Sequence, residues 1–200
     1  MKMIIASHNA HKLEELRRIL LPLGIEAVTD TDIGIALTEA DETGTTFAEN
    51  AFIKADLACK ESGLAAIADD SGLCIDALGG EPGVYSARYA PVGRRKKKVL
   101  AALDGLETDK RTAYFESAVC CVFPNGDTVT ARGVCCGHIG TEPRGEGGFG
   151  YDPIFVTENG KTFAELTAKQ KDAVSHRGKA LRAFAEQLQA YLRKETDYDK

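Results

Sequence analysis

The stretch LAAIADDSG, residues 64–72, places an apolar run directly before two carboxylates and a hydroxyl. A short apolar run bounded by turn residues is typical of a buried strand in the middle of a sheet. We expect Asp69, Asp70 and Ser71 to follow this strand at its C-terminal end, where open α/β sheets bind ligands. Oxygen ligands of this kind suit Mg²⁺. The same residues are ordinary turn formers, so a plain turn is the alternative at this point.

The composition limits the kinds of protein that this chain can be. With 200 residues it can form one domain, or two fused lobes, that buries roughly 70% of its unfolded surface. A formal net charge of −5 argues against a general nucleic-acid binder, which needs a basic face. We expect no signal peptide, and no apolar run approaches the ~20 residues of a membrane span. The sequence therefore predicts a soluble, cytoplasmic protein with neither nucleic acid nor membrane as a partner.

The six cysteines do not have the spacing of a zinc site. Four of them form the adjacent pairs Cys120, Cys121 and Cys135, Cys136 inside strand-like runs, and there is no CxxC motif. This pattern predicts buried free thiols.

The pattern of residues 2–23 predicts a strand, a turn and a helix. The helix has an apolar stripe at helical spacing, formed by Leu13, Leu16, Leu20 and Leu23. Asn9 is expected to cap it, and Lys12 lies in its first turn, where the helix dipole disfavours a cation. A cation at this place suggests a bound phosphate, on which backbone N–H groups and the ammonium would converge. The alternative is an exposed lysine on an ordinary helix.

Strands and helices alternate in the first half of the chain, which favours an α/β sheet with right-handed crossovers. A capping box, Thr46 to Glu49, opens a helix that Gly63 ends. Two β-rich runs, residues 112–123 and 128–138, flank Asn125 and Gly126, which are a strong hairpin signal. Because a hairpin is antiparallel, the sheet is predicted to be mixed.

Three other stretches have unusual composition. The glycine-rich run of residues 145–155 permits close approach of backbone to a ligand, and its aromatic residues offer a stacking face. Ser175 is expected to cap the last helix, which places His176 and Arg177 in its first turn. Five consecutive cations, residues 94–98, suggest either nucleic-acid binding or a solvated helix face, and the lack of aromatic residues among them favours the latter.

Five motifs occur in order along the chain: SHNAHK at 7–12, TFAENAFIKA at 46–55, ADDSGLCIDALGGEPGVYSARYA at 68–90, GGFGYDPIF at 147–155 and AELTAKQKDAVSHRGKAL at 164–181. Together they resemble the inosine triphosphatase or XTP/dITP diphosphatase family, in its bacterial form. The resemblance implies a single domain over residues 1–200, with an elongated, two-lobed mixed sheet flanked by helices and an active-site cleft between the lobes. It also implies a homodimer. Ser7 replaces the usual threonine, and the basic run 94–98 replaces an acidic residue and an asparagine, which bears on the dimer contacts and the cleft electrostatics.

The resemblance also implies a role for individual residues. The triphosphate is expected to contact Ser7, His8, Asn9, Ala10, His11, Lys12 and Lys54. Asp70 is implied as the general base and as a ligand of Mg²⁺ or Mn²⁺, with Asp69 and either Asp41 or Glu42 as further metal ligands. Ser71 is expected to touch the substrate. The base is expected to contact Phe149, Gly150, Tyr151, Asp152, Lys171, His176 and Arg177.

The implied reaction is attack of water on the α-phosphorus of XTP, dITP or ITP, which yields the monophosphate and pyrophosphate and keeps these nucleotides out of DNA and RNA. Three alternatives remain at the level of the sequence. The chain could be a pyrophosphatase for other modified nucleotides, a non-catalytic nucleotide-binding module, or an RNA-binding protein that uses residues 94–98. The full set of carboxylates favours an enzyme.

Overall fold

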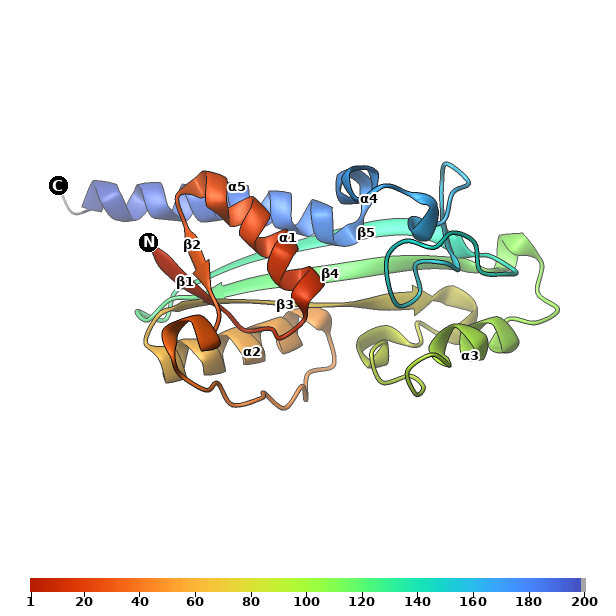
Figure 1. The fold of residues 1–200 in the computed structure, drawn as a ribbon, viewed down its shortest axis with the longest axis horizontal. Helices are drawn as coiled ribbons and strands as arrows, with labels where there is room; N and C mark the ends of the chain where they lie inside the picture. Colours follow the sequence, from red (N-terminus) through yellow and green to blue (C-terminus); the bar gives the residue numbers. More distant parts are fainter. Residues whose placement is uncertain (199–200) are drawn as a thin grey trace. The chain divides into compact units, whose positions relative to one another are not determined.

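A computed structural model describes residues 1–198, without the side chains of His11 and of residues 195–198. Within it, a 6-stranded sheet has the order β2-β1-β3-β4-β5-β6 (Figure 1). The strands are β1 (Lys2–Ile5), β2 (Glu26–Val28), β3 (Ala65–Ile75), β4 (Thr112–Val122), β5 (Thr128–Ile139) and β6 (Phe155–Thr157). Strand β1 pairs in parallel with both β2 and β3, whereas β5 and β6 are antiparallel. The predicted mixed α/β sheet is therefore confirmed.

The helices are α1 (Ala10–Leu20), α2 (Phe47–Ser62), α3 (Arg95–Ala102), α4 (Ala168–Val174) and α5 (His176–Tyr198). Of these, α1, α2 and α5 begin at the caps that the sequence predicts. Asn9 Oδ1 accepts a hydrogen bond from Lys12 N at 3.3 Å, and Ser175 Oγ accepts one from Gly178 N at 3.1 Å. The capping box of Thr46 is present before α2. One boundary differs, because α1 ends three residues early, in a 3₁₀ turn over Leu21–Leu23.

The chain divides into two compact units. The first contains Met1–Asp70, Ala118–Arg132 and the chain from Ala180 onward, and the second contains Ser71–Ser117 and Gly133–Lys179. The boundary falls within β3, between Asp70 and Ser71. The single domain and the cleft between lobes stay predictions.

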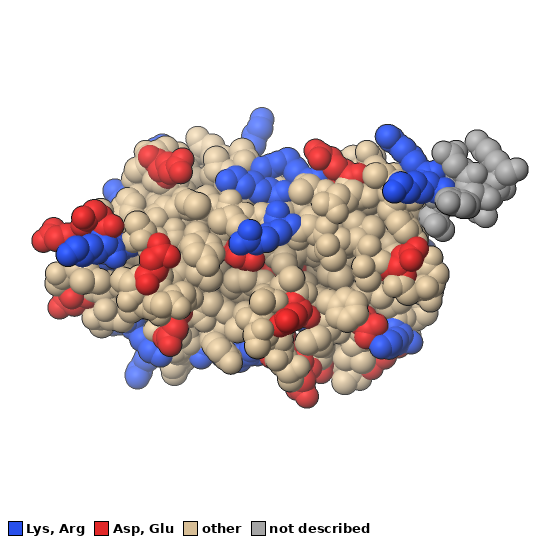
Figure 2. Space-filling view, turned by 180° about the vertical axis from the view of Figure 1, so that it is seen from behind, with Lys and Arg blue, Asp and Glu red and all other residues tan. Residues whose placement is uncertain are grey.

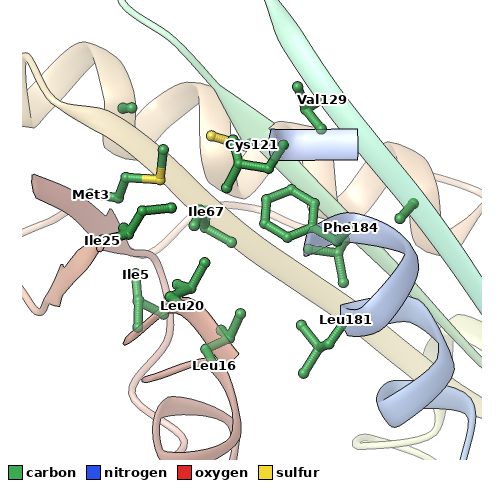
Figure 3. Packing of buried hydrophobic residues seen from close by; sticks show 14 of the residues in the cluster. Met3, Ile5, Leu16, Leu20, Ile25, Ile67, Cys121, Val129, Leu181 and Phe184 are labelled. Atoms are coloured by element: carbon green, nitrogen blue, oxygen red, sulfur yellow. The ribbon is translucent and has the colours of Figure 1, made fainter. Parts of the chain in front are cut away.

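The first unit has an apolar core on one face of its strands. Side chains from β1, β3, α1 and α5 point toward one another there, as Figure 3 shows for Ile67, Leu20 and Phe184. In β3 the residues on this face are the odd-numbered Ala65 and Ile67. Because successive side chains of a strand point to opposite faces, the even-numbered residues of β3 face the other way. Figure 1 shows α2 on the opposite side of the strands from α5.

The strand does not end at Ala68 as expected, and the alternative of a plain turn at this point is wrong as well. Strand β3 runs without a break from Ala65 to Ile75, so the two carboxylates lie in the middle of a strand and the following apolar run belongs to it. Asp69 and Asp70 are only 2% and 8% exposed. A buried carboxylate is tolerated where cations and hydrogen bonds compensate for lost water, and each of these two has a lysine beside it.

All six cysteines are free thiols, and the predicted burial holds for every one except Cys136, which is exposed. No helix among residues 1–198 combines the length and the apolar character needed to cross a membrane. A cytoplasmic location stays a prediction.

Candidate active site

In the first unit, one lysine contacts two carboxylates. Lys54 Nζ lies 2.8 Å from Glu42 Oε1 and 3.4 Å from Asp70 Oδ1. Helix α2 supplies Lys54, strand β3 supplies Asp70, and the loop before α2 supplies Glu42. The side chains of all three are mostly buried, which strengthens their mutual attraction relative to a pair in open water.

Asn50 joins the acidic loop to the strand, a role that the sequence did not reveal. It lies one helical turn before Lys54 in α2 and is fully buried. Its Nδ2 donates to Asp70 Oδ2 at 3.2 Å, and its Oδ1 accepts from Gly44 N at 2.9 Å. A Cβ at position 44 would lie 2.7 Å from that Oδ1, so only glycine permits this approach. The one available signal was an amide within the apolar face of α2.

Asp69 has a different lysine partner from Asp70. Lys12 Nζ lies 3.0 Å from Asp69 Oδ2 and donates to the Asp69 carbonyl oxygen at 3.2 Å. This arrangement follows from the alternation of β3, which turns Asp69 toward the face covered by α1 and Asp70 toward α2. The predicted carboxylate pair is therefore split between two lysines on two helices.

The charges in this group shift the ionisation of Asp70 and Lys54. Burial raises the pKa of Asp70, an effect that nearby ammonium groups oppose only in part. Burial alone would lower the pKa of Lys54, but the carboxylates of Asp70, Glu42 and Asp69 raise it above its ordinary value. Lys54 therefore stays a cation, and Asp70 binds a proton more readily than an exposed aspartate does.

The four predicted metal ligands do not meet at one point. Among the residues that the structure describes, no three His, Cys, Asp or Glu side chains gather closely enough to hold a metal ion. Asp41 is exposed, whereas Glu42 meets Asp70 at Lys54. Two converging carboxylates fit Mg²⁺ or Mn²⁺, because Mg²⁺ usually binds one or two carboxylates together with substrate phosphates and water.

The turn before α1 is held by hydrogen bonds among its own residues. Ser7 Oγ accepts a hydrogen bond from Asn9 N at 3.2 Å, which shapes the turn. His8, Asn9 and Ala10 are exposed. The side chain of His11 lies outside the described part of the structure.

In the second unit, two cations lie beside one exposed aromatic ring. Phe149 is 37% exposed, and its ring centroid is 4.8 Å from Lys171 Nζ and 5.7 Å from Arg177 Cζ. Asp152 Oδ2 accepts from Lys171 Nζ at 2.6 Å and from Phe149 N at 2.8 Å. A Cβ at Gly148 would collide with the Asp152 carboxylate, and the backbone there has φ +69, so this position requires glycine.

The first turn of α5 adds two buried side chains to this group. His176 stacks on Phe115, with ring centroids 4.7 Å apart and planes 11° apart. Arg177 Nη2 donates to Ser71 Oγ at 3.2 Å. Contacts within the second unit thus link six predicted residues into one group around the ring of Phe149 and the start of α5. They are Ser71, Phe149, Asp152, Lys171, His176 and Arg177.

Two other predicted base contacts lie differently. Tyr151 is in the core of the second unit, where its hydroxyl donates to Ser86 O at 2.9 Å. Burial raises the pKa of Tyr151 to about 12. Gly150 is exposed. Of the aromatic residues in this part of the loop, Phe149 is therefore the one that offers a ring to a ligand.

Two side chains of the basic run 94–98 contact the loop that precedes it. Lys98 Nζ donates to Tyr89 O at 2.9 Å and lies 3.7 Å from the centroid of the Tyr89 ring, while Arg95 Nε donates to Ala90 O at 3.4 Å. Figure 2 shows one face of the molecule, on which acidic side chains are scattered around a group of basic ones.

Comparison with known proteins gives a consistent set of relatives. The sequence profile of the Ham1 family matches residues 3–187. The dITP/XTP pyrophosphatase of Bacillus subtilis is 47% identical over 94% of this chain and 96% of its own. That of an Exiguobacterium species is 48% identical over 96% of this chain and 100% of its own. The structure of a HAM1 protein from Coxiella burnetii has a TM-score of 0.87 and 41% identity, and covers 95% of this chain and 99% of its own.

Proposed function

The chain belongs to the Ham1 family, and on this premise we propose that it is a dITP/XTP pyrophosphatase, as its relatives are named. It hydrolyses noncanonical purine nucleoside triphosphates to the monophosphate and pyrophosphate, and so keeps them out of DNA and RNA. The observation that supports this best is the group in the first unit, where Lys12 and Lys54 face the carboxylates of Glu42, Asp69 and Asp70. Such a group offers both the cations and the acidic oxygens that phosphoryl chemistry requires.

The lysines and the turn before α1 bind the triphosphate. Lys12 and Lys54 stabilise the negative charge that develops on the departing pyrophosphate. Backbone N–H groups at the start of α1 add to this, since a helix N-terminus attracts anions. Asp69 holds the Lys12 ammonium in position through a contact of 3.0 Å with its carboxylate.

Asp70 acts as the general base. Its carboxylate orients the attacking water and accepts a proton from it. Asp70 and Glu42 would also hold Mg²⁺ or Mn²⁺, which would neutralise negative charge on the phosphate oxygens. Asn50 keeps the Asp70 carboxylate in one orientation through the hydrogen bond to Oδ2.

The group in the second unit selects the base. Phe149 offers a ring on which a purine can stack. Arg177 and His176 donate to the 6-oxygen of hypoxanthine or xanthine, whereas adenine presents an amino group there. An unpaired buried donor costs about 1–3 kcal/mol, so the preference for ITP over ATP reaches roughly 10² or more. Assembly as a homodimer stays a prediction from the family resemblance.

The test is a substrate panel in which pyrophosphate and orthophosphate are measured separately. With Mg²⁺ and dITP, XTP or ITP we expect pyrophosphate, and much slower release from ATP and GTP. Asp70→Asn should bind dITP but lose turnover, whereas Asp104→Asn, which changes an exposed carboxylate, serves as the matched control. Release of orthophosphate, or a fully active Asp70→Asn variant, would contradict the proposed chemistry.

A further inference from the structure

Lys54 contacts the same two carboxylates that the proposed function assigns to the metal ion. Its ammonium approaches one oxygen of Glu42 and one of Asp70. A divalent cation needs those oxygens as ligands. The lysine and the metal are therefore competitors for one pair of carboxylates.

The surrounding charges keep Lys54 in this place. Lys12 is engaged by Asp69, in contact with both its side chain and its carbonyl oxygen, so it stays with that residue. The two lysines face three carboxylates, which leaves the group with an excess of negative charge. Removing the Lys54 ammonium without a replacement would leave Glu42 and Asp70 as two like charges in a mostly buried place, which is costly.

We propose that Lys54 is a resident counter-cation: it neutralises the Glu42–Asp70 pair in the free protein and leaves it when metal and substrate phosphates bind together. This inference rests on the proposed function for the identity of the incoming groups. The ammonium of Lys54 then pairs with phosphate oxygens, which leaves the carboxylates of Glu42 and Asp70 available to hold the metal ion. Neither ligand alone completes this exchange, because metal alone leaves the ammonium without an acceptor and phosphate alone meets an excess of carboxylates.

Metal and phosphate binding are consequently coupled through one side chain. Coupling between two ligands typically changes an affinity by about 5–150-fold and is reciprocal. The free protein should therefore bind a divalent cation weakly, and removal of the lysine charge should strengthen that binding in the absence of any nucleotide. A lysine that binds only phosphate, away from these carboxylates, would have a much smaller effect.

The experiment measures Mn²⁺ binding without nucleotide, from the electron paramagnetic resonance signal of free Mn²⁺. Lys54→Met and Lys54→Gln should each bind Mn²⁺ at least about tenfold more tightly than the unchanged protein, within the usual range of coupling. Lys60→Met is the matched control, since Lys60 is on the same helix but pairs with Asp56 on its exposed side. It should bind Mn²⁺ as the unchanged protein does. Circular dichroism and urea midpoints check that each variant is folded.

The double variant Glu42→Gln, Lys54→Met shows where the additional Mn²⁺ affinity of Lys54→Met comes from. If the metal enters at the Glu42–Asp70 pair, the double variant loses most of the added affinity. Equal or weaker Mn²⁺ binding by both lysine variants, or a gain that persists without the Glu42 carboxylate, overturns the proposal. Pyrophosphate release from dITP by the unchanged protein is scored separately. If the unchanged protein releases pyrophosphate but the Lys54 variants do not bind Mn²⁺ more tightly, only the counter-cation role of Lys54 is refuted. If the variants bind Mn²⁺ more tightly but the unchanged protein releases no pyrophosphate, only the proposed function is refuted.

Discussion

Replacement of Asn50 by alanine is the sharpest test of how the candidate base is held. The change deletes the hydrogen bonds to Asp70 Oδ2 and from Gly44 N. At about 1 kcal/mol net for each bond, the free energy of unfolding should fall by about 2 kcal/mol, and by more if the buried carboxylate oxygen finds no other donor. A base that is less well oriented loses transition-state stabilisation. A loss of about 1.4 kcal/mol lowers kcat/KM about tenfold.

The same change should move the acid limb of the pH profile. The hydrogen bond from Asn50 lowers the pKa of Asp70, against the larger effect of burial, which raises it. Without this bond the pKa of Asp70 rises further, so at a given acidic pH a smaller fraction of the enzyme carries the ionised base. The midpoint of the acid limb of kcat/KM therefore shifts to higher pH.

The assay is pyrophosphate release from dITP from acidic to neutral pH, with urea unfolding of the same preparations. Glu61→Ala is the matched control, because Glu61 also joins α2 to the preceding loop, through a hydrogen bond of 2.8 Å from Thr38 N, but lies at the C-terminal end of this helix, about three turns after Asn50. It should leave the pH profile in place. If Asn50→Ala keeps both its kcat/KM and its acid limb, the amide does not position the base and the reasoning is refuted.

Three further predictions concern the second unit. Arg177→Ala should reduce the preference for ITP over ATP, measured as the ratio of kcat/KM values, and an unchanged ratio would count against base recognition by this guanidinium. Gly148→Ala should raise KM for dITP with a smaller change in kcat, because the new Cβ displaces the Asp152 carboxylate that holds Phe149 N; wild-type KM values would speak against that contact. Arg111→Met should lower the free energy of unfolding by about 3–5 kcal/mol, since the buried guanidinium donates to three backbone carbonyls at 2.7–2.8 Å; a loss below about 1 kcal/mol in urea titrations would contradict this role.

Features that depend on nearby residues could be predicted from the sequence. The starts of α1, α2 and α5 follow from Asn9, Thr46 and Ser175, because a cap acts on N–H groups only two or three positions ahead. The hairpin at Asn125 and Gly126 is local in the same sense, and Gly126 N donates to Phe123 O there at 2.9 Å. These patterns are complete within a few residues.

Features that depend on distant partners could not be predicted in this way. Asp69 and Asp70 have the local chemistry of a turn, and the strand continues through them because their partners come from elsewhere. Lys12 is 57 positions from Asp69 in the sequence. Tyr151 was expected at the base, but its hydroxyl finds an acceptor in Ser86, 65 positions away. The choice between Asp41 and Glu42 likewise depended on which side chain reaches Lys54.

The unbroken course of β3 limits how this protein can change over evolution. Side chains alternate along a strand, so inserting or deleting one residue between Ile67 and Asp69 would exchange the faces of the two carboxylates. The side chain of Asp70 would then point to the face that carries Lys12, and the side chain of Asp69 would point toward α2. Single substitutions around the two carboxylates keep each of them on its own face of the sheet. A change of one residue in the length of this part of β3 does not, so we expect it to be eliminated by selection. The loop that carries Glu42 has no such alternation, and changes in its length before Asp41 leave the order of the carboxylates intact.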